Sequence, residues 1–522
     1  MLHLRLLLLC IPIIVSHSFS QAWYRLYGFQ SATNGINALR CDRSGNLRIA
    51  GFHYDSLGIF DTVLRSNGSS DCFFLQTDDS GHVLTSYTFG GSGKDAIGDL
   101  AVKPDGHIII TGTFQKTMSL GTAELTAPTS ESFFIAEFTD DATPVWTNVN
   151  SAYYGTALAC NADNTIAVAG QLFDTAVIVP GDTLFGRGEQ DLFLALYSGD
   201  GSPQWAIGAG GTTLDHVSAV EFTARDRIAL AAGFRDTLYF SDTLFAPASI
   251  EEQGIVAVFD TAGNPVWYRP LLSDGTVLLR SITSDSSGMM YLTGRFSGSM
   301  TIDTATLVST GEFSLFIACL QPDGTILWTH TSELVDANDI VVGEDNNLYL
   351  SGNFKKNALF GDSLYDAYDI EDVYLSSYTR DGTFRWVSTA GGCRASYGRK
   401  AVFRGNHCYI AGSTDADLIS KSCTMQFDRL DLSYAQSDRG RTFIAFLDHT
   451  LPPGSMVRNP PSGSHQVKQA SATRVRCYDL LGREITGILS GFSGSRPHRP
   501  LSPYGVVIEQ RSENGICTVH LR

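Results

Sequence analysis

Short apolar runs that end on glycine recur at a nearly fixed interval along most of the chain. The runs are LRIAG, IIITG, IAVAG, IALAAG, MYLTG, LYLSG and CYIAG. Their closing glycines lie 58 to 63 residues apart: Gly51, Gly112, Gly170, Gly233, Gly294, Gly352 and Gly412. Self-similarity at a fixed period indicates a repeat architecture. The seven glycines therefore predict seven units.

Tryptophan marks the same period independently. The chain has six tryptophans, and from the second onward they lie 58 to 62 residues apart: Trp146, Trp205, Trp267, Trp328 and Trp386. Four of these five follow a glycine by four residues, as in PDGTILW, whereas Ala142 replaces the glycine in DDATPVW. Thr85 holds the position in the unit before, and Trp23 lies 62 residues ahead of Thr85. A tryptophan at one phase of a repeat is expected to be a packing residue, not a ligand-binding one.

Each unit shows four short strand signals in order. In the second unit these are DLAVK, HIIITG, SFFIAEF and PVWTNV, separated by turns that carry Gly, Asp and Asn. Such turns accept positive φ and close tight hairpins. Four antiparallel strands repeated seven times predict an all-β fold, a seven-bladed β-propeller of four-stranded blades, over residues 21–450. Closure into a ring also removes exposed sheet edges.

The ring is expected to close through its N-terminus. The last unit has three strand signals, RKAVFR, HCYIAG and TFIAFL, and then reaches the proline-rich LPPG without a tryptophan strand. The first unit has one strand too many, because AWYRLYG precedes its first strand. Trp23 is therefore predicted to lie in the fourth, outermost strand of the blade built from residues near 397–450.

Composition agrees with a globular β-rich chain and restricts its partners. Of the 522 residues, 43% are hydrophobic and 17% are charged, and 51 are glycine. The formal net charge of −17 disfavours nonspecific binding to nucleic acid or to anionic membranes, because both need a basic surface on the protein. We expect no nucleic-acid partner, and a monomer.

Residues 1–20 have the pattern of a signal peptide. One arginine precedes an apolar stretch of about a dozen residues, and the small residues Ser18 and Ser20 stand ahead of Gln21. No later stretch reaches the roughly 18 apolar residues that a membrane-spanning helix needs. The mature chain is expected to start near Gln21, to be exported to the cell surface or beyond, and to contain no transmembrane segment.

The repeat resembles the SBBP repeats of bacterial seven-bladed β-propellers. Residues 90–114, GGSGKDAIGDLAVKPDGHIIITGTF, follow that family's pattern from a double glycine through an Asp-Gly turn to a Thr-Gly-x-Phe ending. The segment DLFLALYSGDGSPQW supplies the remaining D-x-F strand and G-x-x-x-W turn. The resemblance covers residues 21–450. It implies the propeller fold and hardly anything about activity.

The C-terminal part of the chain is predicted to be a Pro-, Gly- and Ser-rich linker over residues 451–472 and a small β-sandwich-like domain over residues 473–522. That domain is similar to the C-terminal sorting domain of the type IX secretion system of Bacteroidota. The matching residues are Val475, Tyr478, Asp479, Gly482, Arg483, Ile485, Gly505, Val506 and Arg522. The resemblance implies that the type IX machinery carries the protein across the outer membrane.

Two departures weaken this second resemblance. Val507 stands where the family usually has Tyr, and the linking segment SGFSGSRPHRP is richer in Arg and Pro than the family pattern. An ordinary β-domain that binds a partner is the alternative. Cys477 and Cys517 stand on strands that could face each other, and a disulfide between them is left open.

Motifs for catalysis or for a metal are scarce. The chain lacks a GxSxG elbow, an HExxH motif and a Walker loop. Nine cysteines remain after residue 20 without a CxxC spacing, and no His-ligated metal is expected because the histidines fall at different phases of the repeat: His107, His216, His330 and His407. The turns CDRSGN, KPDG, NADN, SDSSG and GEDNN offer oxygen ligands that suit calcium. Hairpins need the same residue types, so no cofactor is expected and calcium is the alternative.

Two functions remain open at this stage. The favoured one is a noncatalytic, exported module that binds a protein or a glycan, or that serves as a scaffold. The alternative is an enzyme of the quinoprotein or another hydrolase or lyase type, because DGTILW is similar to the repeat of pyrroloquinoline-quinone propellers. A ligand is expected near the Asp-rich loops between blades, which are SGKDAIGD, TTLDHVS and ELVDANDI.

Overall fold

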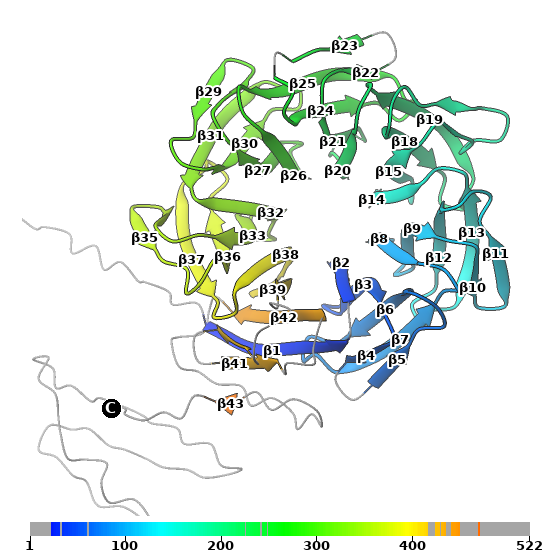
Figure 1. The fold of residues 1–522 in the computed structure, drawn as a ribbon, viewed down its shortest axis with the longest axis horizontal. Coiled ribbons are helices and arrows are strands. Elements are labelled where there is room, and N and C mark those ends of the chain that lie inside the picture. The colour runs from blue at the N-terminus through cyan, green and yellow to red at the C-terminus, as the bar shows by residue number, and fades with distance from the viewer. Residues whose placement is uncertain are drawn as a thin grey trace, which may run out of the picture. The chain divides into compact units, whose positions relative to one another are not determined.

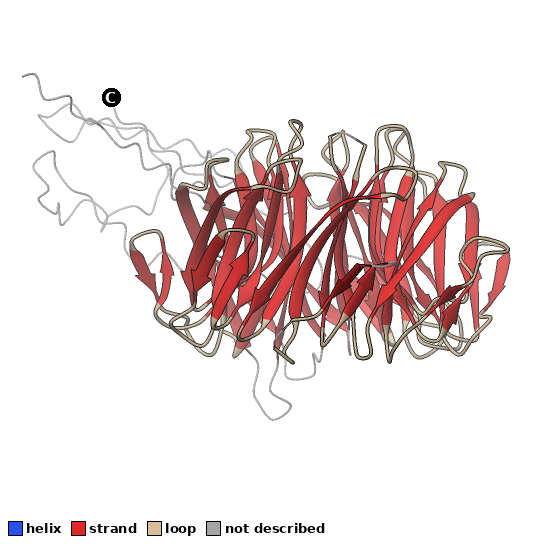
Figure 2. Ribbon diagram, turned by 90° about the horizontal axis from the view of Figure 1, so that it is seen from above, coloured by secondary structure: helices blue, strands red, loops and turns tan. Residues whose placement is uncertain are grey.

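The computed structural model shows seven four-stranded antiparallel sheets arranged as blades around a central channel (Figure 1). The strands run between two faces of the ring, and the loops lie at both faces (Figure 2). The structure describes residues 22–31, 34–59, 62–224, 226–240, 243–247, 249–415, 423–427, 430–434, 440–448 and 468–469. The predicted all-β, seven-bladed fold is confirmed.

Each blade places its first strand at the channel and its fourth strand outermost. The strands of blades one to three are β2 (Asn34–Cys41), β3 (Leu47–His53), β6 (Asp71–Thr77) and β7 (Val83–Phe89); β8 (Ala96–Val102), β9 (Ile108–Phe114), β12 (Ser132–Phe138) and β13 (Pro144–Asn150); and β14 (Tyr154–Cys160), β15 (Ile166–Leu172), β18 (Asp191–Tyr197) and β19 (Pro203–Gly210).

Blades four to seven repeat this order. Their strands are β20 (His216–Phe222), β21 (Ile228–Phe234), β24 (Gln253–Phe259) and β25 (Pro265–Ser273); β26 (Val277–Ser284), β27 (Met290–Phe296), β30 (Ser314–Leu320) and β31 (Ile326–Glu333); β32 (Val335–Val342), β33 (Leu348–Phe354), β36 (Asp372–Tyr378) and β37 (Phe384–Ala390); and β38 (Ala395–Arg404), β39 (His407–Asp415), β42 (Gly440–Asp448) and β1 (Ala22–Ser31).

The N-terminal strand is the outermost strand of blade seven. β1 pairs antiparallel with β42, with Trp23 opposite Leu447 and Phe29 opposite Thr442. Phe29 is buried in a cluster that also contains Ile49 of blade one and Tyr409 of blade seven. The first and last strands of the ring are therefore hydrogen-bonded to each other.

The core lies between neighbouring blades. The second and third strands are buried on both faces, which explains why they are nearly continuous apolar runs instead of alternating ones. Phe74 of blade one packs in one cluster with Ile110 and Phe134 of blade two. Cys393, also buried, forms a disulfide.

A short hairpin lies between the second and third strands of every blade, a feature that the sequence pattern did not reveal. The rim hairpins are β4 (Ser56–Ile59) with β5 (Thr62–Arg65), β10 (Thr117–Leu120) with β11 (Ala123–Thr126), β16 (Thr175–Ala176) with β17 (Leu184–Phe185), β22 (Leu238–Phe240) with β23 (Thr243–Phe245), β28 (Ser299–Ile302) with β29 (Ala305–Val308), β34 (Ala358–Phe360) with β35 (Ser363–Tyr365), and β40 (Cys423–Phe427) with β41 (Leu430–Tyr434).

Rim hairpins also join neighbouring blades. β4, β22 and β28 each hydrogen-bond to the outermost strand of the preceding blade, extending that sheet to six strands. These outer strands are thereby partly shielded at an edge that would otherwise offer free backbone groups. A two-residue strand, β43 (Lys468–Gln469), pairs with β41.

The recurring tryptophan contacts the next blade. Trp328 is half-buried, and its indole Nε1 donates a hydrogen bond to the carbonyl of Arg380, 3.0 Å away, in the hairpin of blade six. A Cβ on Gly382 of that hairpin would lie 2.8 Å from the Trp328 ring, and Gly382 has a φ of 84°. Trp205 and Trp267 make the same bond to Thr261 and Pro322.

The contact between blades one and two lacks both the tryptophan and the glycine of this pattern. Ala142 stands where the other hairpins have glycine, and the preceding blade carries Thr85 where the others carry tryptophan. Ala142 has a φ of 64°, so its backbone keeps the hairpin conformation. The glycine is therefore replaced where no indole from the preceding blade needs the space that a Cβ would fill.

The chain divides into two compact units, Met1–Ala470 and Ser471–Arg522. The second unit lies outside the described residues, as do the predicted signal peptide, most of the predicted linker, Cys477 and Cys517, and the residues assigned to a sorting signal: Tyr478, Asp479, Gly482, Arg483 and Gly505. Within the described part, no helix is long and apolar enough to span a membrane.

Candidate functional site

Every innermost strand carries a β-bulge at the same position. At each bulge one residue has no partner on the second strand, and such a residue can be directed out of the regular pleat. The seven bulged residues are Asn37, Gly98, Thr156, Ser218, Arg280, Asn338 and Arg399. Gly98, Ser218 and Asn338 lie within the Asp-rich segments near which a ligand is expected, but none of the seven was itself predicted as a site residue.

The repeat glycines lie directly beneath these bulges. A Cβ on Gly294 would come within 2.1 Å of the carbonyl oxygen of Leu278, two residues before the bulged Arg280. The same approach, at 1.8 to 2.4 Å, occurs at Gly51, Gly112, Gly170, Gly352 and Gly412. At Gly233 the Cβ would instead meet the His216 ring at 2.3 Å. The repeat glycines therefore mark the point in each blade where the first strand comes close to the second strand.

Several bulged side chains link adjacent blades around the channel. Three donate to a carbonyl just ahead of the next blade's bulge: Asn37 Nδ2 to Ile97 O at 2.7 Å, Ser218 Oγ to Leu279 O at 2.6 Å, and Asn338 Nδ2 to Gly398 O at 2.9 Å. At Gly98 only glycine fits, because a Cβ would lie 2.1 Å from the carbonyl oxygen of Gly155.

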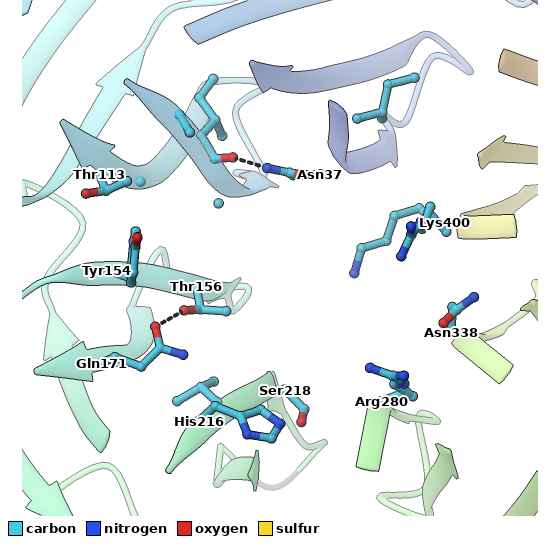
Figure 3. Close-up of a pocket in the computed structure, with 18 of the residues that line it drawn as sticks. Asn37, Thr113, Tyr154, Thr156, Gln171, His216, Ser218, Arg280, Asn338 and Lys400 are labelled. Atoms are coloured by element: carbon cyan, nitrogen blue, oxygen red, sulfur yellow. Dashed lines mark hydrogen bonds between the residues drawn. The ribbon is translucent and has the colours of Figure 1, made fainter. Parts of the chain in front are cut away.

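All seven bulged residues line one cavity of about 500 Å³ at the end of the channel where the inner strands begin. Its two sides differ in charge. Arg280, Asn338 and Lys400 lie on one side, and the uncharged Tyr154 and Gln171 lie on the other (Figure 3). The cavity thus combines a cationic wall with a neutral hydrogen-bonding wall.

One buried carboxylate, Asp336, lies beside the cationic wall. Asp336, 3% exposed, lies 3.2 Å from Arg295 Nη1 and 3.8 Å from Arg280 Nη2. Burial raises the pKa of Asp336, and the neighbouring arginines oppose that rise. In the described part of the chain Lys400 makes no ion pair, and Arg280 Nε is buried without a hydrogen-bond partner. Arg399 Nε donates to Ser413 Oγ at 3.3 Å.

His216 stands between the two walls (Figure 3). Its Nε2 lies 3.4 Å from Glu252 Oε1. Burial lowers the pKa of His216, Glu252 opposes this, and Arg280 and Arg235 add to the lowering. The imidazole is therefore neutral at pH 7 and serves the cavity as a hydrogen-bonding group instead of a further cation.

The Asp-rich loops form the mouth of this cavity, but their aspartates do not supply its charge. Asp95 and Asp215 are fully buried, and each accepts backbone N–H groups: Asp95 from Gly91 at 2.6 Å, and Asp215 from Gly211 at 2.7 Å. The loops near which a ligand is expected thus contribute residues to the cavity, whereas the carboxylates of Asp95 and Asp215 are held by backbone amides.

A second cavity of about 350 Å³ continues along the channel. Two of the acids that line it, Asp339 and Asp99, also join blades. Asp339 accepts from Ser281 Oγ at 2.8 Å and from the amide of Ala401 at 3.0 Å. Arg40 Nη2 lies 2.8 Å from Asp99 Oδ1 in the same way. Carboxylates that hold neighbouring strands together have few lone pairs left for a ligand.

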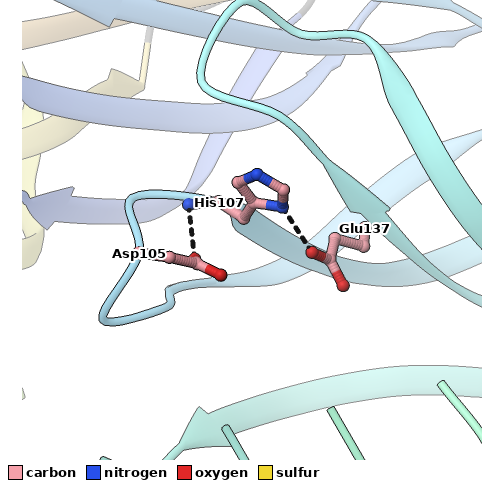
Figure 4. Close-up of side chains that lie close together, drawn as sticks. All are labelled: Asp105, His107 and Glu137. Carbon is pink, nitrogen blue, oxygen red and sulfur yellow. Dashed lines mark hydrogen bonds and ion pairs between the residues drawn. The ribbon is translucent and has the colours of Figure 1, made fainter. Parts of the chain in front are cut away.

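One cluster of potential metal ligands occurs among the described residues: Asp105, His107 and Glu137 (Figure 4). Glu137, 3% exposed, is already surrounded by donors. Its Oε1 lies 2.5 Å from His107 Nδ1 and 2.9 Å from Lys103 Nζ, and its Oε2 accepts from Trp146 Nε1 at 2.5 Å. An ammonium group at this distance competes with a cation, so the geometry fits an ion-pair network.

The turns considered for calcium are occupied by their own backbone. Asp42 Oδ1 accepts the amides of Ser44 and Asn46 at 2.8 and 2.9 Å, and Asp285 Oδ1 accepts those of Ser287 and Met289 in the same pattern. These carboxylates stabilise the tight hairpins that they begin. His330 and His407 lie in β31 and β39 of different blades, apart from His107 and His216.

No protein-family model matches the sequence. An uncharacterized WD repeat-containing protein of Acanthamoeba polyphaga mimivirus is 22% identical over an aligned length of 260, and the match covers 39% of this chain and 18% of that protein. The chain thus spans less than a fifth of this relative. The match supports a repeat propeller.

Solved structures with a similar arrangement are distant. The Dos1 propeller matches with a TM-score of 0.40 and 9% identity, over 82% of this chain and 95% of that one. A quinohemoprotein alcohol dehydrogenase from Pseudomonas putida HK5 matches with a TM-score of 0.38 and 8% identity, over 85% and 78%. Neither similarity bears on activity.

Proposed function

We propose that this protein is a noncatalytic binding module that holds its ligand, a glycan, in the central cavity. The supporting observation is that each of the seven blades contributes its bulged residue to the same cavity. A volume of about 500 Å³ falls within the roughly 300–1,000 Å³ typical of small-ligand pockets. The propeller fold itself is consistent with a binding or scaffold role.

Filling the cavity tests this proposal. Thr156 lies on the neutral wall, so a Thr156→Trp variant places an indole in the cavity, whereas Leu327→Trp places one on an exposed outer strand. Wild type and both variants are applied to a glycan array after circular dichroism has shown that they are folded. We expect Thr156→Trp alone to lose binding, and equal binding by all three proteins would contradict the proposal.

We also propose that the protein is exported, with residues 1–20 as the signal and residues 473–522 recognised by a type IX system. The support is the sequence resemblance of these segments. A reporter fused to residues 451–522 is expected to reach the surface of a host that has this system. A fusion to residues 451–472 alone is the control, and periplasmic retention of both fusions would refute the sorting role.

A further inference from the structure

We infer that the glycan bound in the central cavity carries a carboxylate, and that this carboxylate lies against Arg280, Arg399 and Lys400. The inference rests on the proposed binding function and names the chemical class of its ligand. The three cationic side chains come from blades five and seven and line the same cavity. The ligand class is a sugar acid at the end of, or within, a glycan.

The charge of this wall is opposite to that of the molecule. The chain has a formal net charge of −17, yet three cations line the cavity and Asp336 is the acid that neutralises part of them. Asp336 is nearer to Arg295 than to Arg280 and is shared between them. The cavity therefore attracts an anionic group that most of the protein surface repels.

Two cationic side chains on this wall offer donors to the cavity. The Arg280 side chain is 36% exposed, and its Nη2 lies 3.8 Å from Asp336. Lys400 directs its ammonium group toward the middle of the cavity (Figure 3). A carboxylate supplies an acceptor to both side chains, and charge-assisted hydrogen bonds are stronger than neutral ones.

The opposite wall suits the body of a sugar. Thr156 Oγ1 donates to Gln171 Oε1 at 2.7 Å, which leaves the Gln171 amide nitrogen turned away from Thr156 (Figure 3). Burial raises the pKa of Tyr154, so its hydroxyl is protonated at neutral pH, where it interacts with Tyr153. The uncharged side chains of Thr156 and Gln171 complement ring hydroxyls.

The negative net charge of the protein favours a ligand with a single carboxylate over a polyanion. A nucleic acid or a heavily phosphorylated chain would extend its charges beyond the cavity, over a protein with a surplus of 17 acidic charges. Such a ligand would meet repulsion outside the cationic wall. A glycan with one carboxylate and many hydroxyls avoids this repulsion.

The test uses calorimetry on the folded mature chain. The probes are digalacturonic acid, a glucuronate-terminated disaccharide and a sialyl disaccharide, each with its neutral methyl ester. We expect one of the acids to bind at least about tenfold more tightly than its ester, the size expected for a charged hydrogen bond, and we expect salt to weaken it. Equal affinity of acid and ester, or no binding by any acid, would overturn the inference.

Variants locate the carboxylate. Arg280→Gln and Lys400→Gln are each expected to weaken the acid at least about tenfold while changing the ester little. Lys356→Gln, in an exposed rim position, is the matched control. Lys400→Gln keeps the test decisive if Arg280→Gln proves unstable, because Lys400 lines the cavity without pairing to Asp336. Unchanged binding by Lys400→Gln would contradict the inference.

Three further outcomes separate the hypotheses. Displacement of the sugar acid by inorganic phosphate at equal concentration would mean a general anion site and would reject the sugar acid as the ligand. Array binding of a neutral glycan that Thr156→Trp abolishes would retain the proposed function and reject the carboxylate. If neither the sugar acids nor the neutral glycans distinguish wild type from the cavity variants, the cavity is rejected as the binding site.

Discussion

Single indole rings connect one blade to the next by burial and by a hydrogen bond. Trp328 lies over the Gly382 hairpin and donates to the carbonyl of Arg380. Because the ring is half-buried, its removal forfeits less than the 3–5 kcal/mol typical of a fully buried tryptophan. The contact belongs to the fold, and the tryptophan lies outside the residues that line the cavity.

We expect Trp328→Ala to lower the free energy of unfolding by about 2–3 kcal/mol, through lost apolar contact and an unpaired carbonyl. Urea denaturation followed by circular dichroism measures this change. Thr85→Ala, at the same phase of a blade without tryptophan, is the control and is expected to cost less than about 0.5 kcal/mol. Equal losses in the two variants would show that the indole contact contributes nothing.

Buried aspartates in the loops between blades make stability depend on pH. Burial raises the pKa of Asp95 to about 7 and that of Asp215 to about 8, against a reference value of 3.8. Between pH about 4 and about 8 the folded chain holds protons that the unfolded chain has released. Stability contributed by these groups therefore falls as pH rises through this window and is level above it.

Asp95→Asn is expected to flatten the decline between pH 4.5 and pH about 7, since an amide carries no titratable proton there. The measurement is the urea midpoint at half-unit pH steps, compared with wild type and with the exposed control Asp163→Asn. A slope in Asp95→Asn identical to that of wild type would argue that this carboxyl does not retain its proton on folding.

At the scale of strands, the β-bulge and the repeat glycine act together. The glycine allows the inner strand to approach its neighbour, and the bulge then directs one side chain into the channel. All seven blades have this bulge, yet the bulged residues are of five types: Asn, Gly, Thr, Ser and Arg. Strand geometry is thus constant while the chemistry of the cavity wall varies.

Gly294→Ala is expected to destabilise the protein by about 1–3 kcal/mol, as overpacking does, because its Cβ would lie 2.1 Å from Leu278 O. It should also weaken ligand binding by displacing Arg280. Gly208→Ala is the control, since its Cβ would meet nothing closer than 3.9 Å. Equal thermal midpoints for the two variants would contradict a role for the glycine in admitting the bulge.

The repeat was predictable from sequence because it depends on contacts that recur in each blade. The spacing of the glycines and the G-x-x-x-W turns both reflect such contacts. The Asp-rich loops indicated the end of the channel where the cavity lies, but its cationic wall was not predictable, since Arg280, Arg399 and Lys400 share no motif and come from blades five and seven. The rim hairpins escaped notice because their strands are two to five residues long, too short for alternation to show.

At the scale of the molecule, blade seven unites the two ends of the ring. β1 is the outermost strand of blade seven and β42 is its third strand, and the two are hydrogen-bonded along most of their length. A propeller without β1 would leave β42 with an exposed edge, and unpaired edges promote aggregation.

Deletion of residues 22–31 is expected to lower the thermal midpoint and to promote aggregation at micromolar concentration. Light scattering during a thermal ramp reports both effects. A synthetic peptide of residues 21–35 added to the truncated protein should restore part of the midpoint, and a peptide of the same composition in scrambled order should not. A midpoint unchanged by the deletion would show that the ring does not depend on this strand.

The pairing of β1 with β42 joins the two segments of the ring that are synthesised furthest apart in time. Residues 22–31 are made near the start and residues 440–448 about four hundred residues later. A contact between segments so distant in sequence carries a large loop-closure cost and slows folding. A chain that stops before residue 440 lacks this pairing, and β1 then keeps the free backbone groups of an unpaired edge.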